Sequence, residues 1–189
     1  RHGRTVANAA GLLQGRVDNP LDDEGQKQAG WIAKALGPVD RVISSPLQRA
    51  LQTAEPLGQI PRIDERWIEL DYGEWDSRPV ADITPDEWAA WRADPSFSPP
   101  GGESLIELDQ RVAAACEEII SEAEELRVAV FTHVSPIKST IAWALGVSEQ
   151  ISWRLNVAQA QITKIVIRDG RPVITAFNET AHLHKGGLG

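Results

Sequence analysis

Methionine is absent from the 189 residues of this chain, and cysteine and tyrosine each occur once. The single cysteine, Cys116, cannot form an internal disulfide, which suits a reducing cytoplasm. No apolar run approaches the roughly 18 residues needed to cross a membrane, and no signal peptide is visible. These absences predict a cytoplasmic protein that does not enter a membrane.

Positive charge is also scarce, because the net charge is -8 at pH 7. Without a basic surplus to neutralise phosphates, general nucleic-acid binding is not expected. However, 14 of the 19 basic residues are arginines, the side chain best suited to grip phosphate with two hydrogen bonds. A small anionic substrate in a locally positive pocket is therefore compatible with this composition.

Short β-rich segments alternate with helical ones along the chain, without repeats or linkers. This alternation predicts an α/β fold, a three-layer α/β/α sandwich with a mostly parallel central sheet. Capping residues, Gly-Pro stops and an Asp169-Gly170 hairpin turn mark the element ends. Helices are expected over 22–36, 46–57, 104–126 and 135–145, and strands over 39–44, 127–132, 162–168 and 172–177. Residues 1–189 are expected to form one domain, whose first strand precedes residue 1.

Ligands of such sheets bind beyond the carboxyl ends of the strands. Arg49 follows the strand 39–44, and His133 follows the strand 127–132. Arg1 and His2 would follow the strand expected before residue 1. The sequence therefore predicts that two histidines and two arginines converge at one edge of the sheet.

These side chains suit phosphoryl transfer. The neutral imidazole of His2 can attack phosphorus and hold the phosphoryl group covalently. Arg1, Arg49 and His133 can neutralise the phosphate oxygens, so neither a metal nor another cofactor is required. Glu69, in an aromatic segment beside bound phosphate, is expected to be protonated readily enough to act as the general acid. The nearby carboxylates Asp71 and Glu74 are alternatives for that role.

The order of these residues resembles the signature of the histidine phosphatase superfamily, and the match covers nearly the whole chain. The motif blocks share the family's residue types in the family's order. They are Arg1-His2-Gly3-Arg4-Thr5, Asn8, Gln14-Gly15, Pro20-Leu21, Gly25, Ser44-Ser45-Pro46-Leu47-Gln48-Arg49-Ala50, Thr53-Ala54, Glu69 with Gly73 and Trp75, Gly101-Gly102-Glu103-Ser104, Arg111 and His133.

The resemblance implies a phosphoglycerate-mutase-like fold and a role for each matching residue. His2 would be the phosphorylated nucleophile and Glu69 the proton donor. The resemblance also implies a phosphate pocket formed by Arg1, Asn8, Arg49 and His133, with Gln14 and Gly15 lining the site. Val134 stands where the family usually has glycine, and its backbone amide is expected to contact phosphate. This variant is similar to α-ribazole-phosphatase-like domains of actinobacteria, some of which follow a ribonuclease H domain.

The expected function is therefore metal-independent hydrolysis of a small phosphomonoester through a phosphohistidine. Candidate substrates are α-ribazole phosphate and sugar or glycerate phosphates. A phosphoglycerate-mutase-type phosphotransferase and a catalytically silent phospho-ligand-binding protein are the alternatives. Trp88 and Trp91 stand one turn apart on a predicted helix and are candidates for the substrate-pocket wall. A homodimer and a fused upstream ribonuclease H-like domain are left open.

Overall fold

A parallel sheet of three strands, in the order β2-β1-β3, forms the centre of the fold. The computed structural model describes residues 1–183. The strands are β1 (Arg41–Ser44), β2 (Arg62–Ile63) and β3 (Val128–Phe131). β1 is parallel to both neighbours, and its last residue lies opposite the last residue of β3. The segments that follow these two strands therefore start side by side.

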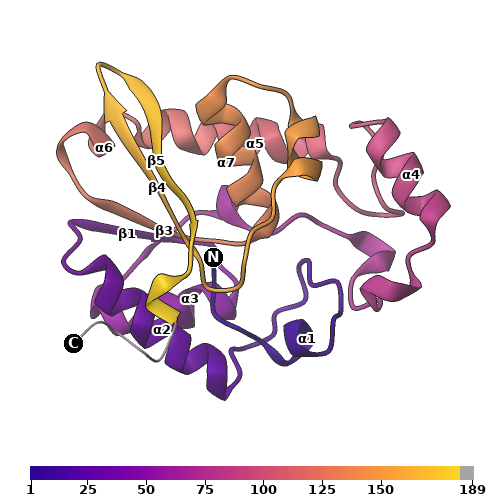
Figure 1. Cartoon of the computed structure of the whole chain (residues 1–189), viewed down its shortest axis with the longest axis horizontal. Coiled ribbons are helices and arrows are strands. Elements are labelled where there is room, and N and C mark those ends of the chain that lie inside the picture. Colours follow the sequence, from indigo (N-terminus) through magenta and orange to yellow (C-terminus); the bar gives the residue numbers. More distant parts are fainter. Residues whose placement is uncertain (184–189) are drawn as a thin grey trace.

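Helices cover both faces of the sheet, as Figure 1 shows. Val42 and Phe131 point into one core with the helices on their face, and Ile43 points into the opposite core. This alternation follows from the two-residue period of a strand. The covering helices are α2 (Asp23–Leu36) and α3 (Gln48–Ala54) on one face, and α5 (Leu105–Ile119) and α7 (Val134–Leu145) on the other. The predicted three-layer α/β architecture is confirmed.

Local signals in the sequence account for most element ends. Asp22 caps α2 by accepting a hydrogen bond from the Gly25 amide, and Gly37 ends that helix with a positive φ of 63°. Ser104 and Glu107 form a capping box at the start of α5. Three shorter helices complete the set: α1 (Val6–Ala9), α4 (Pro85–Ala93) and α6 (Glu122–Glu125).

The prediction of one continuous helix over 104–126 is wrong. α5 ends at Ile119, and a turn separates it from the single turn of α6. Ile120 and Ser121 keep right-handed helical torsion angles, so the interruption is local and affects the hydrogen-bond pattern of the helix rather than its direction of winding. Glu118, next to this turn, pairs with Arg62 and Arg66.

A C-terminal hairpin, β4 (Ile162–Arg168) and β5 (Arg171–Glu179), forms a second, antiparallel sheet. The turn at Asp169-Gly170 has positive φ at both residues, as the sequence predicts. A groove of about 540 Å³ runs between β3 and β4 and reaches Arg1. The strand expected before residue 1 stays a prediction. No helix in residues 1–183 is long and apolar enough to cross a bilayer.

Candidate active site

The segments after β1 and β3 meet the N-terminal segment at one point. The His2 amide donates to the Thr132 carbonyl at 3.0 Å, and the Ser45 amide donates to the Phe131 carbonyl at 2.9 Å. The rings of His2 and His133 lie with their centroids 5.1 Å apart. His2 and His133 therefore lie together at the carboxyl ends of the strands, where the sequence predicted that they would converge.

The hydrogen bond of His2 fixes which of its ring nitrogens carries a proton. Its Nδ1 lies 2.7 Å from the Gly3 carbonyl, which can only accept, so this nitrogen carries the proton. The other nitrogen, Nε2, therefore keeps its lone pair. Burial, and then the charges of Arg1 and Arg49, lower the pKa of His2 well below 6.5. At neutral pH the ring is uncharged and able to attack.

Arg49 is fully buried in the first turn of α3. Its Nε donates to Nδ1 of His133 at 3.2 Å, and its two Nη atoms donate to the carbonyls of Val17 and Gly15 at 2.9 and 2.6 Å. A guanidinium has five N–H groups, so two remain for a ligand. Burial lowers the pKa of Arg49, and the negative charge of Glu69 partly offsets this shift. The guanidinium stays charged at neutral pH.

His133 is fully buried and directly precedes α7. Its Nδ1 accepts the hydrogen bond from Arg49, which assigns the ring proton to Nε2, 2.7 Å from the Ser45 hydroxyl. Burial and the Arg49 charge lower the pKa of His133 well below 6.5. His133 is therefore a neutral part of the site, and the positive charge comes from the arginines.

Two buried donors at the site have no hydrogen-bond partner among the described residues. They are Nε of Arg1 and Nε2 of Gln14. The rest of each side chain is fixed: Arg1 donates to the Val157 carbonyl at 2.8 Å, and Gln14 accepts from the Thr5 hydroxyl at 2.7 Å. Burial lowers the pKa of Arg1 to about 10, so it remains charged at pH 7. An unpaired buried donor costs about 1–3 kcal/mol, so each of these two groups is available to donate to a ligand.

Glu69 lies across the site on the loop after the 3₁₀ helix Glu65–Trp67 and is 3% exposed. Its carboxylate accepts from the amides of Leu70, Val134 and Ser135 at 2.8, 3.0 and 3.1 Å. The amide of Val134, expected to contact phosphate, is thus directed at the acid. This amide therefore fixes the orientation of the Glu69 carboxylate.

The two alternative acids are placed differently. Asp71 accepts from the Gly73 amide at 2.9 Å and pairs with Arg16 at 3.2 Å. Glu74 is exposed. Neither shares the contact of Glu69 with the start of α7, which follows His133 directly. The geometry therefore favours Glu69 as the acid.

Asn8 and Gly15 support the loop that carries Gln14. The side-chain oxygen of Asn8 accepts from the Thr5 amide at 3.2 Å, and the Thr5 hydroxyl oxygen accepts from the Asn8 amide at 3.1 Å, which caps α1. The Gly15 amide donates to Asp76 at 2.9 Å, and its carbonyl accepts from Arg49. Asn8 contacts Thr5 and Gly15 contacts Arg49, and the expected roles of the two residues in binding phosphate stay predictions.

Sequence reasoning found Arg111 in the motif but assigned it no role. In the structure Arg111 forms a bidentate ion pair with Glu103, at 2.6 and 2.8 Å. It also donates to the carbonyls of Arg66, Ile68 and Glu69, at 2.7, 2.8 and 3.2 Å. Arg111 is thus a positioning residue that holds the loop of the acid. Its place in the motif was the only available signal.

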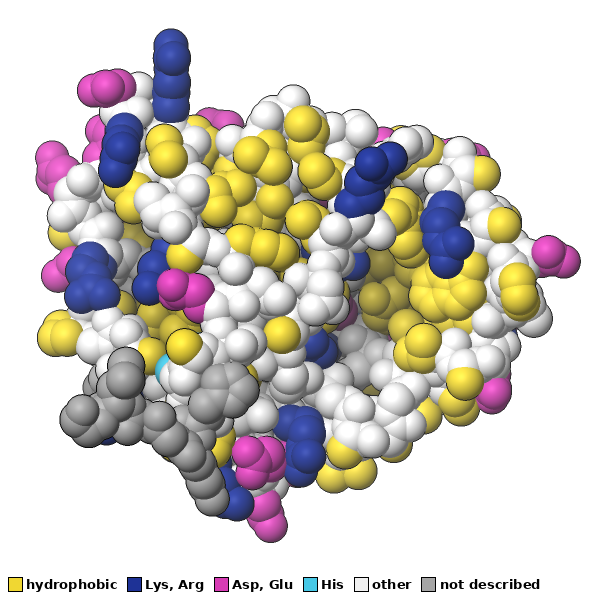
Figure 2. All heavy atoms as spheres, in the orientation of Figure 1, with side chains coloured by type: hydrophobic (Ala, Val, Ile, Leu, Met, Phe, Trp, Pro, Cys, Tyr) yellow, Lys and Arg dark blue, Asp and Glu magenta, His cyan; other side chains and the backbone are white. Residues whose placement is uncertain are grey.

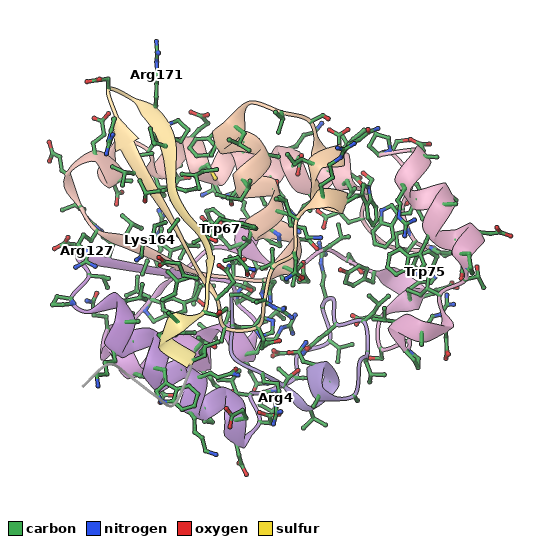
Figure 3. All side chains as sticks on the ribbon, viewed as in Figure 1. Arg4, Trp67, Trp75, Arg127, Lys164 and Arg171 are labelled. Atoms are coloured by element: carbon green, nitrogen blue, oxygen red, sulfur yellow. The ribbon has the colours of Figure 1, made fainter. Side chains whose placement is uncertain are left out.

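Beside the acid lies a small pocket of about 110 Å³, lined by Val134, Ser135 and aromatic side chains. Trp88 and Trp91, predicted as wall residues, both line it and stack with their centroids 5.7 Å apart. Figure 2 shows a hollow on this side of the molecule, with hydrophobic and Lys or Arg side chains around it. In Figure 3, the labelled Trp75 lies beside α4, on the same side of the molecule as the hollow.

Comparison with known proteins agrees with this geometry. The family model of the histidine phosphatase superfamily (branch 1) matches residues 1–180. The bifunctional protein Rv2228c of Mycobacterium tuberculosis is 32% identical over 194 residues, which cover 97% of this chain and 53% of that protein. The chain thus spans about half the length of this relative.

Solved structures resemble the fold closely. A phosphoserine phosphatase from Entamoeba histolytica, solved as a histidine-to-alanine mutant with phosphoserine, has a TM-score of 0.90 and 27% identity, covering 97% of this chain and 96% of that one. An Escherichia coli protein named provisionally as an α-ribazole-5′-P phosphatase has a TM-score of 0.82 and 28% identity, covering 95% and 93%.

Proposed function

Because the chain belongs to the histidine phosphatase superfamily, we propose that it hydrolyses small phosphomonoesters through a phosphohistidine on His2, without a metal ion. The observation that carries this proposal is the hydrogen bond from Nδ1 of His2 to the Gly3 carbonyl, 2.7 Å long. It leaves the lone pair of Nε2 free within a buried cage that holds Arg1 and Arg49. The named phosphatases among the similar structures support the same reaction class.

The first step transfers the phosphoryl group to the protein. Nε2 of His2 forms a bond to phosphorus while the bond to the ester oxygen breaks. Arg1 and Arg49 stabilise the charge on the transferred oxygens. Glu69 gives its proton to the leaving oxygen.

The second step restores the enzyme. Water attacks the phosphohistidine, the N–P bond breaks, and Glu69 accepts a proton from that water. A phosphoglycerate-mutase-type transfer remains the alternative, in which a second alcohol replaces water. A silent binding role is disfavoured, because the nucleophile, both arginines and the acid are all assembled. The homodimer, the upstream domain and the cytoplasmic location stay predictions.

The test is to trap the phosphorylated residue. During turnover of p-nitrophenyl phosphate, we expect acid-labile phosphate on His2, and His2→Ala should lower kcat by about 10⁴-fold or more, because the nucleophile is lost. His182→Gln removes a histidine that contacts only the Ala160 carbonyl among the described residues, and serves as the matched control. Full activity of His2→Ala, or loss of wild-type activity with EDTA, would refute the proposal.

A further inference from the structure

Lys138 stands out among the cations near the site because no residue in 1–183 pairs with it. It lies on α7, one turn after Val134, and is half-buried. Among the described residues it forms neither an ion pair nor a hydrogen bond. Arg111 and Arg49, by contrast, use most of their donors within the protein. The Lys138 ammonium is not among the buried polar atoms that lack a partner, so it is reached by solvent and is available to pair with an anionic ligand.

This lysine lines the small pocket beside the acid. The pocket's walls are mainly aromatic and aliphatic, and Lys138 is the one charged side chain among the described residues that line it. Trp88 and Trp153 meet edge to face at 6.1 Å, and Tyr72 packs edge to face on Trp91 at 5.9 Å. The pocket therefore offers apolar surface and one positive charge.

The pocket opens next to the bond that would be broken. Val134 and Ser135 line it, and their amides hold the carboxylate of Glu69. The pKa of Lys138 lies below its ordinary value, because burial lowers it; the charge of Glu69 raises it and the charge of Arg1 lowers it, so the ammonium lies within electrostatic reach of both residues. The alcohol that receives the proton of Glu69 must leave on this side.

The size of the pocket restricts that alcohol. At about 110 Å³ it is well below the roughly 300 Å³ at which pockets for drug-sized ligands begin. A group of a few heavy atoms fits, whereas a nucleoside does not. Apolar walls suit a short carbon skeleton, and the lysine suits a carboxylate on it.

We infer that Lys138 is a specificity-determining residue that binds a negative charge on the leaving group. This inference rests on the proposed function. If Lys138 binds a carboxylate on the leaving group, the preferred substrates are small phosphomonoesters of hydroxy acids. A cationic alcohol would be rejected, because no acidic side chain of the described residues lines the pocket to pair with it. A neutral alcohol would leave the ammonium unpaired.

A pair of substrates that differ in one group tests this inference. 3-Phosphoglycerate and sn-glycerol 3-phosphate share three carbons and a phosphate, but only the first has a carboxylate. Wild type should favour 3-phosphoglycerate in kcat/KM by about tenfold or more, the value of one charged hydrogen bond. Lys138→Gln should remove that preference while changing kcat/KM for sn-glycerol 3-phosphate and p-nitrophenyl phosphate by less than about twofold. Lys138→Arg should retain it.

Lys164→Gln is the matched control, because it removes the same charge from the hairpin. Figure 3 shows Lys164 away from Trp75 and the α4 segment, and it pairs with Glu179 at 2.7 Å. Thermal melting confirms that each variant is folded. A preference that is absent in wild type, or retained in Lys138→Gln, overturns the inference. So does equal loss on all three substrates, or faster turnover of α-ribazole phosphate that is independent of Lys138. Failure of wild type to hydrolyse p-nitrophenyl phosphate identifies failure of the proposed function itself.

Discussion

The phosphate cage and the leaving-group pocket differ in how tightly the protein holds them. The cage residues His2, Arg49 and His133 are at most 3% exposed, and hydrogen bonds fix each of them. In the pocket, the inner wall of Leu70, Trp91 and Leu105 is buried as well. However, Trp88 and Trp153 are half-buried, and Lys138 has no partner among the described residues. The two regions meet at Glu69, which the start of α7 holds in place.

The difference separates catalysis from selection. Charge on a transferring phosphoryl group is stabilised best by donors that need not move during the reaction, and the buried, hydrogen-bonded cage suits that task. Selection needs only one charge and a shaped wall, and a wall of aromatic side chains can be changed without disturbing the cage. One cage can thus serve different substrates when the residues around the leaving group differ.

Among the variants that compare the cage with the pocket, the largest loss of activity is expected at Glu69, where the two regions meet. Glu69→Gln should lower kcat/KM for sn-glycerol 3-phosphate by about 10²–10³-fold, because the alkoxide then lacks its proton. p-Nitrophenolate leaves without protonation, so kcat/KM for p-nitrophenyl phosphate should fall by less than about tenfold. Steady-state kinetics on both substrates provides the measurement. Glu74→Gln, at an exposed position, is the control. Equal losses on both substrates would show that Glu69 is not the acid.

A change within the cage should slow every substrate alike. Arg49→Lys keeps the charge but cannot reproduce three hydrogen bonds in three directions, so kcat/KM should fall by about 10²-fold. The ratio between 3-phosphoglycerate and sn-glycerol 3-phosphate should stay within about twofold of wild type, because Lys138 is unchanged. Arg41→Lys, on an exposed arginine, is the control. A shifted ratio would mean that cage and pocket are coupled.

The smallest effect concerns stability. Burial holds the pKa of His2 and His133 below 6.5 in the folded protein, whereas both titrate near 6.5 when unfolded. As pH falls below 6.5, the unfolded chain takes up protons that the folded protein refuses, so stability falls. Each histidine contributes about 1.4 kcal/mol of lost stability per pH unit. This loss continues until the folded pKa is reached.

Urea unfolding at pH 7.5, 6 and 5 measures this loss. His133→Gln should remove its share of the pH dependence, whereas His182→Gln should change it less, because His182 is only partly buried. The same pKa shifts predict that kcat/KM retains its full value somewhat below pH 6.5, since His2 is still neutral there. An unchanged slope in His133→Gln would contradict a neutral, buried His133.

Much of the fold was predictable because its signals are local. Asp22, Ser104 and Gly37 act within one helical turn of their own positions, and Asp169-Gly170 sets its hairpin through two backbone angles. The convergence of His2, Arg49 and His133 was predictable for a topological reason. Parallel strands bring the residues after their carboxyl ends to one edge.

The remaining features depend on contacts between distant segments. Glu69 meets the amides of Val134 and Ser135 across 65 and 66 residues, and no local pattern indicates that contact. Likewise, Lys138 forms no ion pair within residues 1–183 because the fold places no acidic side chain of that range within ion-pair distance of its ammonium. The sequence by itself determined the elements, the layers and the residue types at the reaction centre, because these follow from periodicity, capping and strand order. Only the tertiary structure decided which side chains are neutral, which donors are used and what the pocket selects, because burial and long-range hydrogen bonds set those properties.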